Sequence, residues 1–235
     1  MPGSGPVQMP LDLGAAPSYA EADFLVAGGN RDAFAAIEGW RSWTAPTRAL
    51  AGPEGSGKTH LAHLFAARSG GRILPAGALT IDAVPDLLAA GAAVLDDADR
   101  GVDERALFHL LNLARERDAR LLLTGRAPPA RWAVSLADLR SRLAALPIVM
   151  IGPPDETLLA ALLVKLFADR QLRVEPDLPA YLLPRLERSC AAIRAAVAAL
   201  DAASLERQRP VTAALARDVL GLGTASATPR DRSGG

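Results

Sequence analysis

The chain has 235 residues, of which half are hydrophobic and 22% are charged. This composition excludes a disordered or fibrous protein and allows one domain of ordinary size or two small ones. Twenty-six basic residues balance 26 acidic ones, which argues against a protein that wraps nucleic acid with its whole surface. With a single cysteine, Cys190, the chain can form neither a disulfide framework nor a multi-cysteine zinc site. The longest uncharged apolar run, residues 143–151, is too short to cross a bilayer, so we expect a cytoplasmic protein without a membrane partner.

Five short apolar segments alternate with helical segments in the first two thirds of the chain. Such alternation predicts an α/β domain with a five-stranded parallel sheet and helices on both faces. The expected strands cover residues 48–51, 72–74, 92–95, 120–124 and 148–151, and the clearest helices between them cover residues 30–43, 57–68 and 103–117.

After residue 153 the pattern changes to helices without a strand. Glycine, proline and aspartate at residues 152–155 mark the boundary. We therefore expect the α/β domain over residues 21–153, an all-helical domain over residues 154–220, and a flexible tail over residues 221–235. The expected helices of the second domain cover residues 155–169, 177–188, 190–207 and 213–220.

A glycine-rich segment follows the first expected strand and precedes a helix. It reads Gly52-Pro53-Glu54-Gly55-Ser56-Gly57-Lys58-Thr59 and matches the phosphate-loop pattern G-x-x-x-x-G-K-[ST] in its proper context. The glycines let successive N–H groups face one anion, and the helix start adds its positive end. Lys58 can reach between the β- and γ-phosphates, and the Thr59 hydroxyl can hold Mg²⁺. Only Lys58 and Lys165 are lysines among the 26 basic residues, so a lysine at this position indicates a specific fit to the cradle.

Two carboxylates end the third expected strand. Asp96 and Asp97 follow the apolar run at residues 92–95. Beside a phosphate loop, Asp96 can hold Mg²⁺ together with Thr59, and Asp97 can orient the attacking water as a catalytic residue. The alternative is a polar cap on a buried strand. Asp99 falls beyond the strand, where we expect it to be solvated.

Taken together, these motifs resemble those of the AAA+ nucleotide-binding family, and within it the bacterial DnaA replication-initiator branch. The phosphate loop continues as G-K-T-H-L, the third strand ends in D-D, and the fourth strand runs into T-G-R-A-P-P. The resemblance covers about residues 19–220 and implies an AAA+ P-loop NTPase with a helical lid domain. Three further segments resemble the family's adenine-side segment, its box VII and its second sensor, namely residues 24–31, 139–143 and 193–200.

The resemblance implies roles for single residues. Residues 52–59 and His60 would bind ADP or ATP with Mg²⁺, and Arg194 in the lid would contact the phosphates of the same nucleotide. His60 lies on the helix after the loop, where we expect a surface position or a contact with the lid. Thr124, at the tip of the fourth strand, would sense the γ-phosphate. Arg142 would be an arginine finger that reaches a nucleotide in a neighbouring subunit.

One position departs from the family pattern. The family's acidic residue after the fourth strand is Arg126 here, and its following arginine is Ala127. Since this strand tip helps to form the γ-phosphate end of the site, the departure implies a weak ATPase at most.

Residues 1–20 contain many glycines and prolines, which predicts a flexible tail. Within it, residues 8–13 (Q-M-P-L-D-L) resemble the Q-L-x-L-x-L peptides that dock on the bacterial sliding clamp. Met9, Leu11 and Leu13 would be apolar anchors, and Gln8 would supply amide hydrogen bonds. The alternative is a tail that contains a few apolar residues by chance.

A clamp-binding tail in front of a DnaA-like core resembles the Hda (HdaA) type of regulatory inactivator of DnaA. The initiators carry a helix-turn-helix domain that reads DNA, and after about residue 220 we expect no such domain. The resemblance implies a negative regulator of replication initiation that binds the DNA-loaded sliding clamp, pairs with ATP-bound DnaA and stimulates its ATP hydrolysis. DNA contact would be indirect, through the clamp, and the protein would be associated with the replisome and nucleoid.

Two alternatives remain at this point. One is a DnaC-like helicase loader, and the other is an AAA+ motor or other DnaA-related ATPase with steady ATP turnover of its own. The resting nucleotide, ADP or ATP, and self-association to a homo-oligomer stay open.

Overall fold

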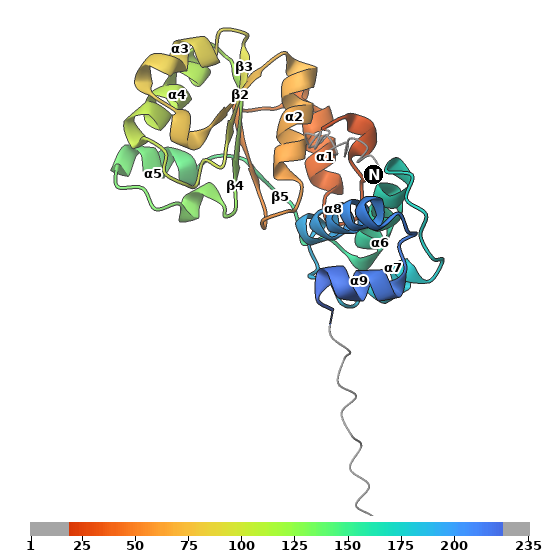
Figure 1. The fold of residues 1–235 in the computed structure, drawn as a ribbon. Helices are drawn as coiled ribbons and strands as arrows, with labels where there is room; N and C mark the ends of the chain where they lie inside the picture. Colours follow the sequence, from red (N-terminus) through yellow and green to blue (C-terminus); the bar gives the residue numbers. More distant parts are fainter. Residues whose placement is uncertain (1–18, 223–235) are drawn as a thin grey trace, which may run out of the picture.

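The computed structural model describes residues 19–222 as an α/β domain joined to a smaller helical domain (Figure 1). The expected clamp-binding residues, Gln8, Met9, Leu11 and Leu13, lie outside the described residues. The same holds for the C-terminal segment from residue 223 onwards.

Five strands form one parallel sheet, as the sequence predicts, and their order in the sheet is β2-β3-β4-β1-β5. Because the strands are parallel, the phosphate loop after β1 and the carboxylates at the end of β3 lie at the same edge of the sheet. Only β4 separates these two strands. The strands are β1 (Thr47–Ala51), β2 (Arg72–Pro75), β3 (Ala92–Asp96), β4 (Arg120–Gly125) and β5 (Ile148–Met150).

Helices cover both faces of the sheet, because successive side chains of a buried strand point to opposite sides. Leu50, Val94 and Leu122 pack on the side of α1 and α2, whereas Leu95 and Leu121 pack on the side of α3, α4 and α5. Figure 1 shows these two helical layers on either side of the sheet. The helices are α1 (Arg31–Glu38), α2 (Lys58–Ser69), α3 (Val84–Leu87), α4 (Glu104–Glu116) and α5 (Ala137–Ala144).

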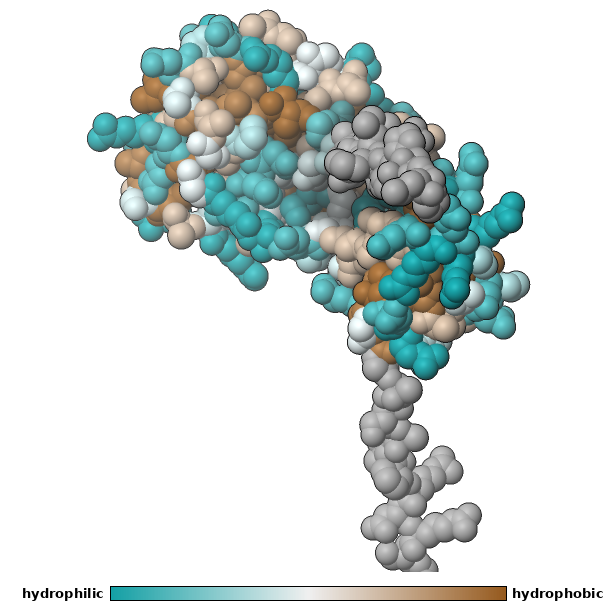
Figure 2. All heavy atoms as spheres, viewed as in Figure 1, coloured by the Kyte–Doolittle hydropathy of each residue, from teal (hydrophilic) through white to brown (hydrophobic). Residues whose placement is uncertain are grey.

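Four helices form the second domain, the lid, around a core of its own. Asp155, Ser189 and Thr212 cap α6, α8 and α9, each accepting a hydrogen bond from a backbone N–H in the first turn. In Figure 2, apolar side chains reach the surface over the lid and, separately, over the lobe that holds α3 and α4. The lid helices are α6 (Glu156–Asp169), α7 (Leu178–Leu182), α8 (Cys190–Arg207) and α9 (Ala213–Leu220).

The structure differs from the predicted helices in two places. The helix expected at residues 177–188 ends at Leu182, because Pro184 has no N–H to continue its hydrogen bonding. The helix expected at residues 30–43 ends before Gly39 and resumes as the 3-10 turn η2 (Trp40–Ser42).

Several short elements have no counterpart in the sequence analysis, because periodicity cannot be read in so few residues. The unpredicted elements are α3, α5, η1 (Glu21–Asp23), η3 (Ala76–Ala78), η4 (Ile81–Ala83) and η5 (Pro129–Arg131), together with an isolated parallel bridge between Val174 and Val211.

Among the helices of residues 19–222, none is long and apolar enough to cross a membrane.

Candidate functional site

The phosphate loop lies between the end of β1 and the start of α2, in the arrangement that the sequence predicts. Gly55 and Gly57 have φ angles of +70° and +98°, which residues with a Cβ rarely adopt. A Cβ on Gly57 would lie 3.2 Å from the Phe24 ring. The loop thus needs glycine both for its conformation and for its close packing.

The Lys58 ammonium lies against the loop. Its Nζ donates hydrogen bonds to the carbonyl oxygens of Gly52 (2.9 Å) and Pro53 (2.8 Å), and the residue is 6% exposed. Burial lowers the pKa of Lys58, and the nearby negative charges of Asp97 and Asp99 act against this effect. A cation in this position is available to an anion seated in the loop.

A chain of hydrogen bonds joins three elements at the edge of the sheet. Thr59 of α2 donates to Oδ2 of Asp96 at 3.1 Å, and Thr124 of β4 donates to Oδ1 of the same carboxylate. The backbone N–H of Asp97 in turn donates to the Thr124 hydroxyl at 2.9 Å. The structure therefore brings together Thr59 and Asp96, the two residues expected to hold Mg²⁺.

Thr124 lies near the end of β4, as the sequence predicts. Its side chain is fully buried, and its hydroxyl hydrogen is directed to Asp96. This geometry makes Thr124 an orienting residue for the carboxylate. Asp97, by contrast, is exposed and has a left-handed backbone conformation with φ of +54°.

Asp99 corrects one expectation, because it is not solvated. Its Oδ2 accepts a hydrogen bond from the backbone N–H of Arg126 at 2.7 Å, and its Oδ1 is buried without a hydrogen-bond partner among residues 19–222. The turn after β3 folds back onto the end of β4, which shields this carboxylate from water. The Arg126 guanidinium forms an ion pair with Glu54 of the phosphate loop. The residue that departs from the family pattern therefore bridges β4 and the loop.

A cavity of about 320 Å³ extends from the phosphate loop to the lid. Phe24 and Leu25, from the segment expected on the adenine side, form part of its wall, and Asn30 holds that segment in shape. The Asn30 side chain accepts from the Ala27 N–H at 2.7 Å and donates to the Leu25 carbonyl at 2.9 Å. The cavity is lined by Tyr19, Asp23, Phe24, Leu25, Asn30, Gly55, Ser56, Gly57, Lys58, Thr59, His60, Leu158, Leu162, Cys190, Ala191 and Arg194.

His60 lines this cavity and is buried, so of the two expected positions the one on the helix surface is wrong. Its Nε2 lies 2.9 Å from the carbonyl oxygen of Ala20, so this nitrogen carries the hydrogen and donates it. Burial lowers the pKa of His60, which favours the neutral ring. The ring makes edge contacts with Tyr19 and Phe24, with centroids 5.6 Å and 5.2 Å away. His60 therefore shapes the wall of the site as a neutral side chain.

The lid contributes the start of α8 to the site. A Cβ on Gly55 would lie only 3.1 Å from the Cβ of Ala191, so the lid touches the phosphate loop directly. Arg194 lines the cavity and is otherwise exposed. Burial raises the pKa of the Cys190 thiol, while the charge of Arg194 lowers it. The structure thus brings Arg194 to the side of the cavity that the resemblance implies.

Arg142 lies apart from the other expected site residues. It is on α5, outside the cavity lining, and its guanidinium lies 4.9 Å above the ring of Phe108 on α4. Among residues 19–222 it forms no ion pair with a carboxylate. Its charge is therefore not neutralised within the described part of the chain.

The residues present fit a nucleotide and a divalent cation. The Ser56 hydroxyl is buried in the loop without a hydrogen-bond partner among residues 19–222, as expected for a group that faces a ligand. Hydroxyl and carboxylate oxygens, from Thr59 and Asp96, are ligands that Mg²⁺ prefers. Sequence reasoning missed Tyr19, Asp23, Leu158 and Leu162, because no local motif distinguishes them; only the tertiary packing brings them to the cavity.

Comparison with known proteins supports the same architecture. Residues 155–220 match the family model described as Hda, lid domain. Domain III of the Thermotoga maritima replication initiation protein DnaA superposes with a TM-score of 0.74 at 18% identity, over 88% of this chain and 97% of that one.

Two further solved structures extend the likeness. AMPPCP-bound DnaA from Aquifex aeolicus has a TM-score of 0.62 at 21% identity, over 82% of this chain and 69% of that one. The Thermotoga maritima RuvB Holliday junction branch migration motor has a TM-score of 0.66 at 14% identity, over 87% and 72% of the two chains. The chain therefore has the same fold as domain III of DnaA and as the RuvB motor, and its lid residues match the Hda lid-domain model.

Proposed function

We propose that the cavity binds an adenine nucleotide, ADP or ATP, with Mg²⁺. The loop backbone and Lys58 would hold the phosphates, Thr59 and Asp96 would hold the metal, and Phe24 would lie on the side of the base. DnaA structures of the same fold have been solved with the ATP analogue AMPPCP, which supports this assignment. The buried, unpartnered Ser56 hydroxyl gives independent support.

We further propose that the protein is a negative regulator of replication initiation, which binds the sliding clamp and stimulates ATP hydrolysis by DnaA. The observation that carries this proposal is the combination of an Hda-type lid with an arginine, Arg142, that lies outside its own site. An unpaired guanidinium of this kind can stabilise the developing charge on the γ-phosphate of a partner's nucleotide. Residues 8–13 would bring the protein to the clamp, and DNA contact would be indirect.

The proposed function assigns little ATP turnover to the protein's own site. After β4 the family has an acidic residue, whereas this chain has Arg126. Arg126 forms an ion pair with Glu54 of the phosphate loop. The exposed Asp97 remains our candidate for orienting water there. Steady hydrolysis would favour the motor alternative instead.

Replacing Lys58 with alanine should weaken ADP binding by roughly 1–3 kcal/mol, because a charge-assisted contact to phosphate is lost. Titration with fluorescent ADP measures the change. The control is Arg105→Ala, which removes an exposed cation of α4 outside the cavity. Unchanged affinity in a folded Lys58→Ala protein would defeat the assignment of the loop.

Replacing Thr124 with valine should reduce the gain in nucleotide affinity that Mg²⁺ provides. Valine keeps the shape of the side chain but removes the O–H that orients Asp96. We expect nucleotide binding in EDTA to stay close to wild type, and the Mg²⁺-dependent gain to fall by about 1 kcal/mol, the usual size of one hydrogen bond. Equal Mg²⁺ dependence in both proteins would show that Thr124 does not set the metal site.

Changing Gln8, Leu11 and Leu13 together to alanine should abolish clamp binding, since it removes two apolar anchors and the amide. Binding to immobilised clamp is measured for the wild type, the triple variant and a Ser4→Ala control outside the motif. Nucleotide affinity serves as a check on the folded core. Clamp binding that survives in the triple variant would move the clamp contact elsewhere.

Replacing Arg142 with alanine should spare binding of nucleotide and clamp yet remove the stimulation of DnaA, since an arginine finger contributes roughly 10³–10⁵ in rate in related reactions. The assay follows hydrolysis of ATP preloaded on DnaA, with clamp and DNA present. Arg140→Ala, two residues away and exposed on the same helix, is the matched control. Equal stimulation by wild type and Arg142→Ala would refute the role of Arg142 in trans.

A further inference from the structure

A short segment before α1 contacts both the α/β domain and the lid along one wall of the cavity. This segment, residues 19–25, is named the strap here, and its centre is the 3-10 turn η1. Tyr19, Asp23, Phe24 and Leu25 of the strap all line the cavity. The strap therefore forms part of the cavity wall beside the lid, so a movement of the lid relative to the strap changes the shape of the cavity.

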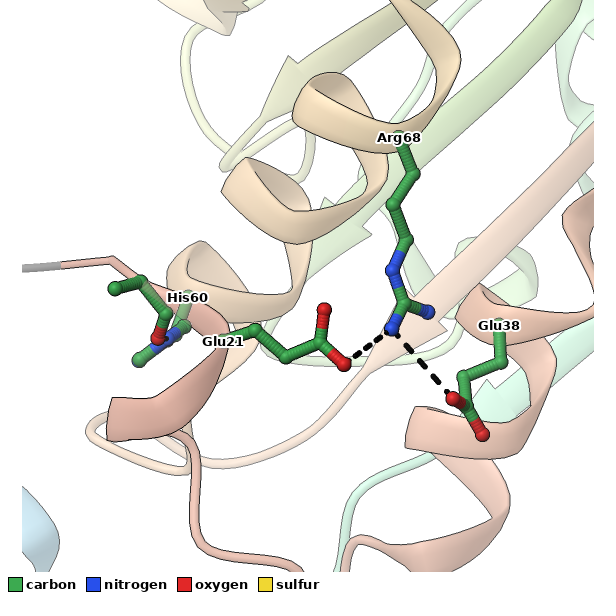
Figure 3. A network of polar contacts seen from close by, with 5 residues as sticks. Glu21, Glu38, His60 and Arg68 are labelled. Carbon is green, nitrogen blue, oxygen red and sulfur yellow. Dashed lines mark hydrogen bonds and ion pairs between the residues drawn. The ribbon is translucent and has the colours of Figure 1, made fainter.

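On one side, the strap is fastened to α2. The Tyr19 ring stacks on His63, with centroids 3.9 Å apart and planes within 4°. The Ala20 carbonyl accepts the hydrogen bond from His60, and the Arg68 guanidinium pairs with Glu21 at 2.6 Å. Figure 3 shows Arg68 reaching down from α2 between Glu21 and a second carboxylate, on α1. Tyr19 and Ala20, which we expected in the flexible tail, are thus part of the folded domain.

On the other side, the strap is fastened to the lid by Lys165 of α6. The ammonium donates to Oδ1 of Asp23 at 2.7 Å and to Oδ2 of Asp169, on its own helix, at 2.7 Å. The side chains of Lys165 and Asp23 are only 23% and 27% exposed. The carboxylates of Asp169 and Asp23 raise the pKa of Lys165. Leu25, two residues on, packs against the core of the lid, whereas Phe24 packs against the core of the α/β domain.

Lys165 shares one face of α6 with the apolar wall of the cavity. Leu158, Leu162 and Lys165 follow one another at helical spacings of four and three residues, which places them in one row. Leu158 and Leu162 line the cavity, and Lys165 meets the strap at the end of the row. A rotation that lifts the two leucines from the cavity must also separate Lys165 from Asp23.

We propose that Lys165 is a positioning residue, whose ion pair with Asp23 holds the lid closed over the cavity and slows the release of bound nucleotide. The inference rests on the proposed nucleotide binding and adds a residue that touches neither phosphate nor metal. It also accounts for the second of the two lysines, since a compact ammonium with three N–H donors can bridge two carboxylates on different elements.

The test measures how fast fluorescent ADP leaves the full chain when chased with excess unlabelled ADP at low salt. Lys165→Met removes the ion pair and keeps the length of the side chain. We expect release to be about two- to fivefold faster, the range that corresponds to one partly exposed ion pair. Added salt should speed release from the wild type towards the Lys165→Met rate and leave the variant nearly unchanged.

Two variants separate the bridge to the strap from the pair within α6. Asp169→Asn removes the pair within the helix and should release ADP at the wild-type rate. Lys165→Arg keeps a cation opposite Asp23 and should stay closer to wild type than Lys165→Met. Release at the wild-type rate from Lys165→Met, or equally fast release from Asp169→Asn, overturns the proposal.

Hydrogen exchange gives a second readout that needs no ligand. The amides of Asp23 and Phe24 donate to the carbonyls of Ala20 and Glu21, and they should exchange faster in Lys165→Met than in wild type or Asp169→Asn. If the wild type binds no ADP, the proposed nucleotide function fails. In that case the exchange experiment still tests Lys165, because unchanged exchange of these two amides in Lys165→Met would overturn its role.

Discussion

The carboxylate of Asp96 is the contact on which the geometry of the site depends. It accepts hydrogen bonds from Thr59 at the start of α2 and from Thr124 on β4, and it ends β3 itself. A half-buried carboxylate is costly to desolvate unless hydrogen bonds compensate it, so these two hydroxyls fix where the three elements meet. Because α2 begins at the phosphate loop, the same contact sets the distance between the loop and the carboxylate end of the sheet. A phosphate bound by the loop and a metal held by Asp96 would then lie at a set distance from each other.

The junction between the two domains is the second constraint on the site. The lid reaches the phosphate loop at Ala191, opposite Gly55, where there is no space for a further side chain. Near the other end of the junction, the backbone N–H of Gly152 donates to the carbonyl of Gly29 at 2.8 Å, which ties the interdomain linker to the loop before α1. The cavity therefore has walls from both domains, and its volume depends on how the lid sits.

Cations are divided between two tasks in this fold. Lys58, Arg126 and Arg194 lie at or beside the cavity, whereas Arg142 lies on α5 above Phe108. Arg126 is paired with Glu54, and the other charges have no carboxylate partner among the ion pairs of residues 19–222. The Arg142 guanidinium is half-buried and stacks on the Phe108 ring, which restricts its position without neutralising its charge. This division agrees with the function we propose, in which the protein holds one nucleotide and acts on another.

The phosphate loop, the five strands with the longer helices between them along the chain, and the position of the lid domain follow from the sequence by itself. Their signals are local, since glycine spacing, apolar runs and caps act within a few residues. The burial of His60, the backbone hydrogen bond to Asp99, the direction of the Thr124 hydroxyl and the contact between Lys165 and Asp23 were decided only by the tertiary structure. Asp23 and Lys165 are 142 residues apart in the chain. Such contacts arise when separately predictable elements pack together, because packing decides which side chains lose water and which partners remain within reach.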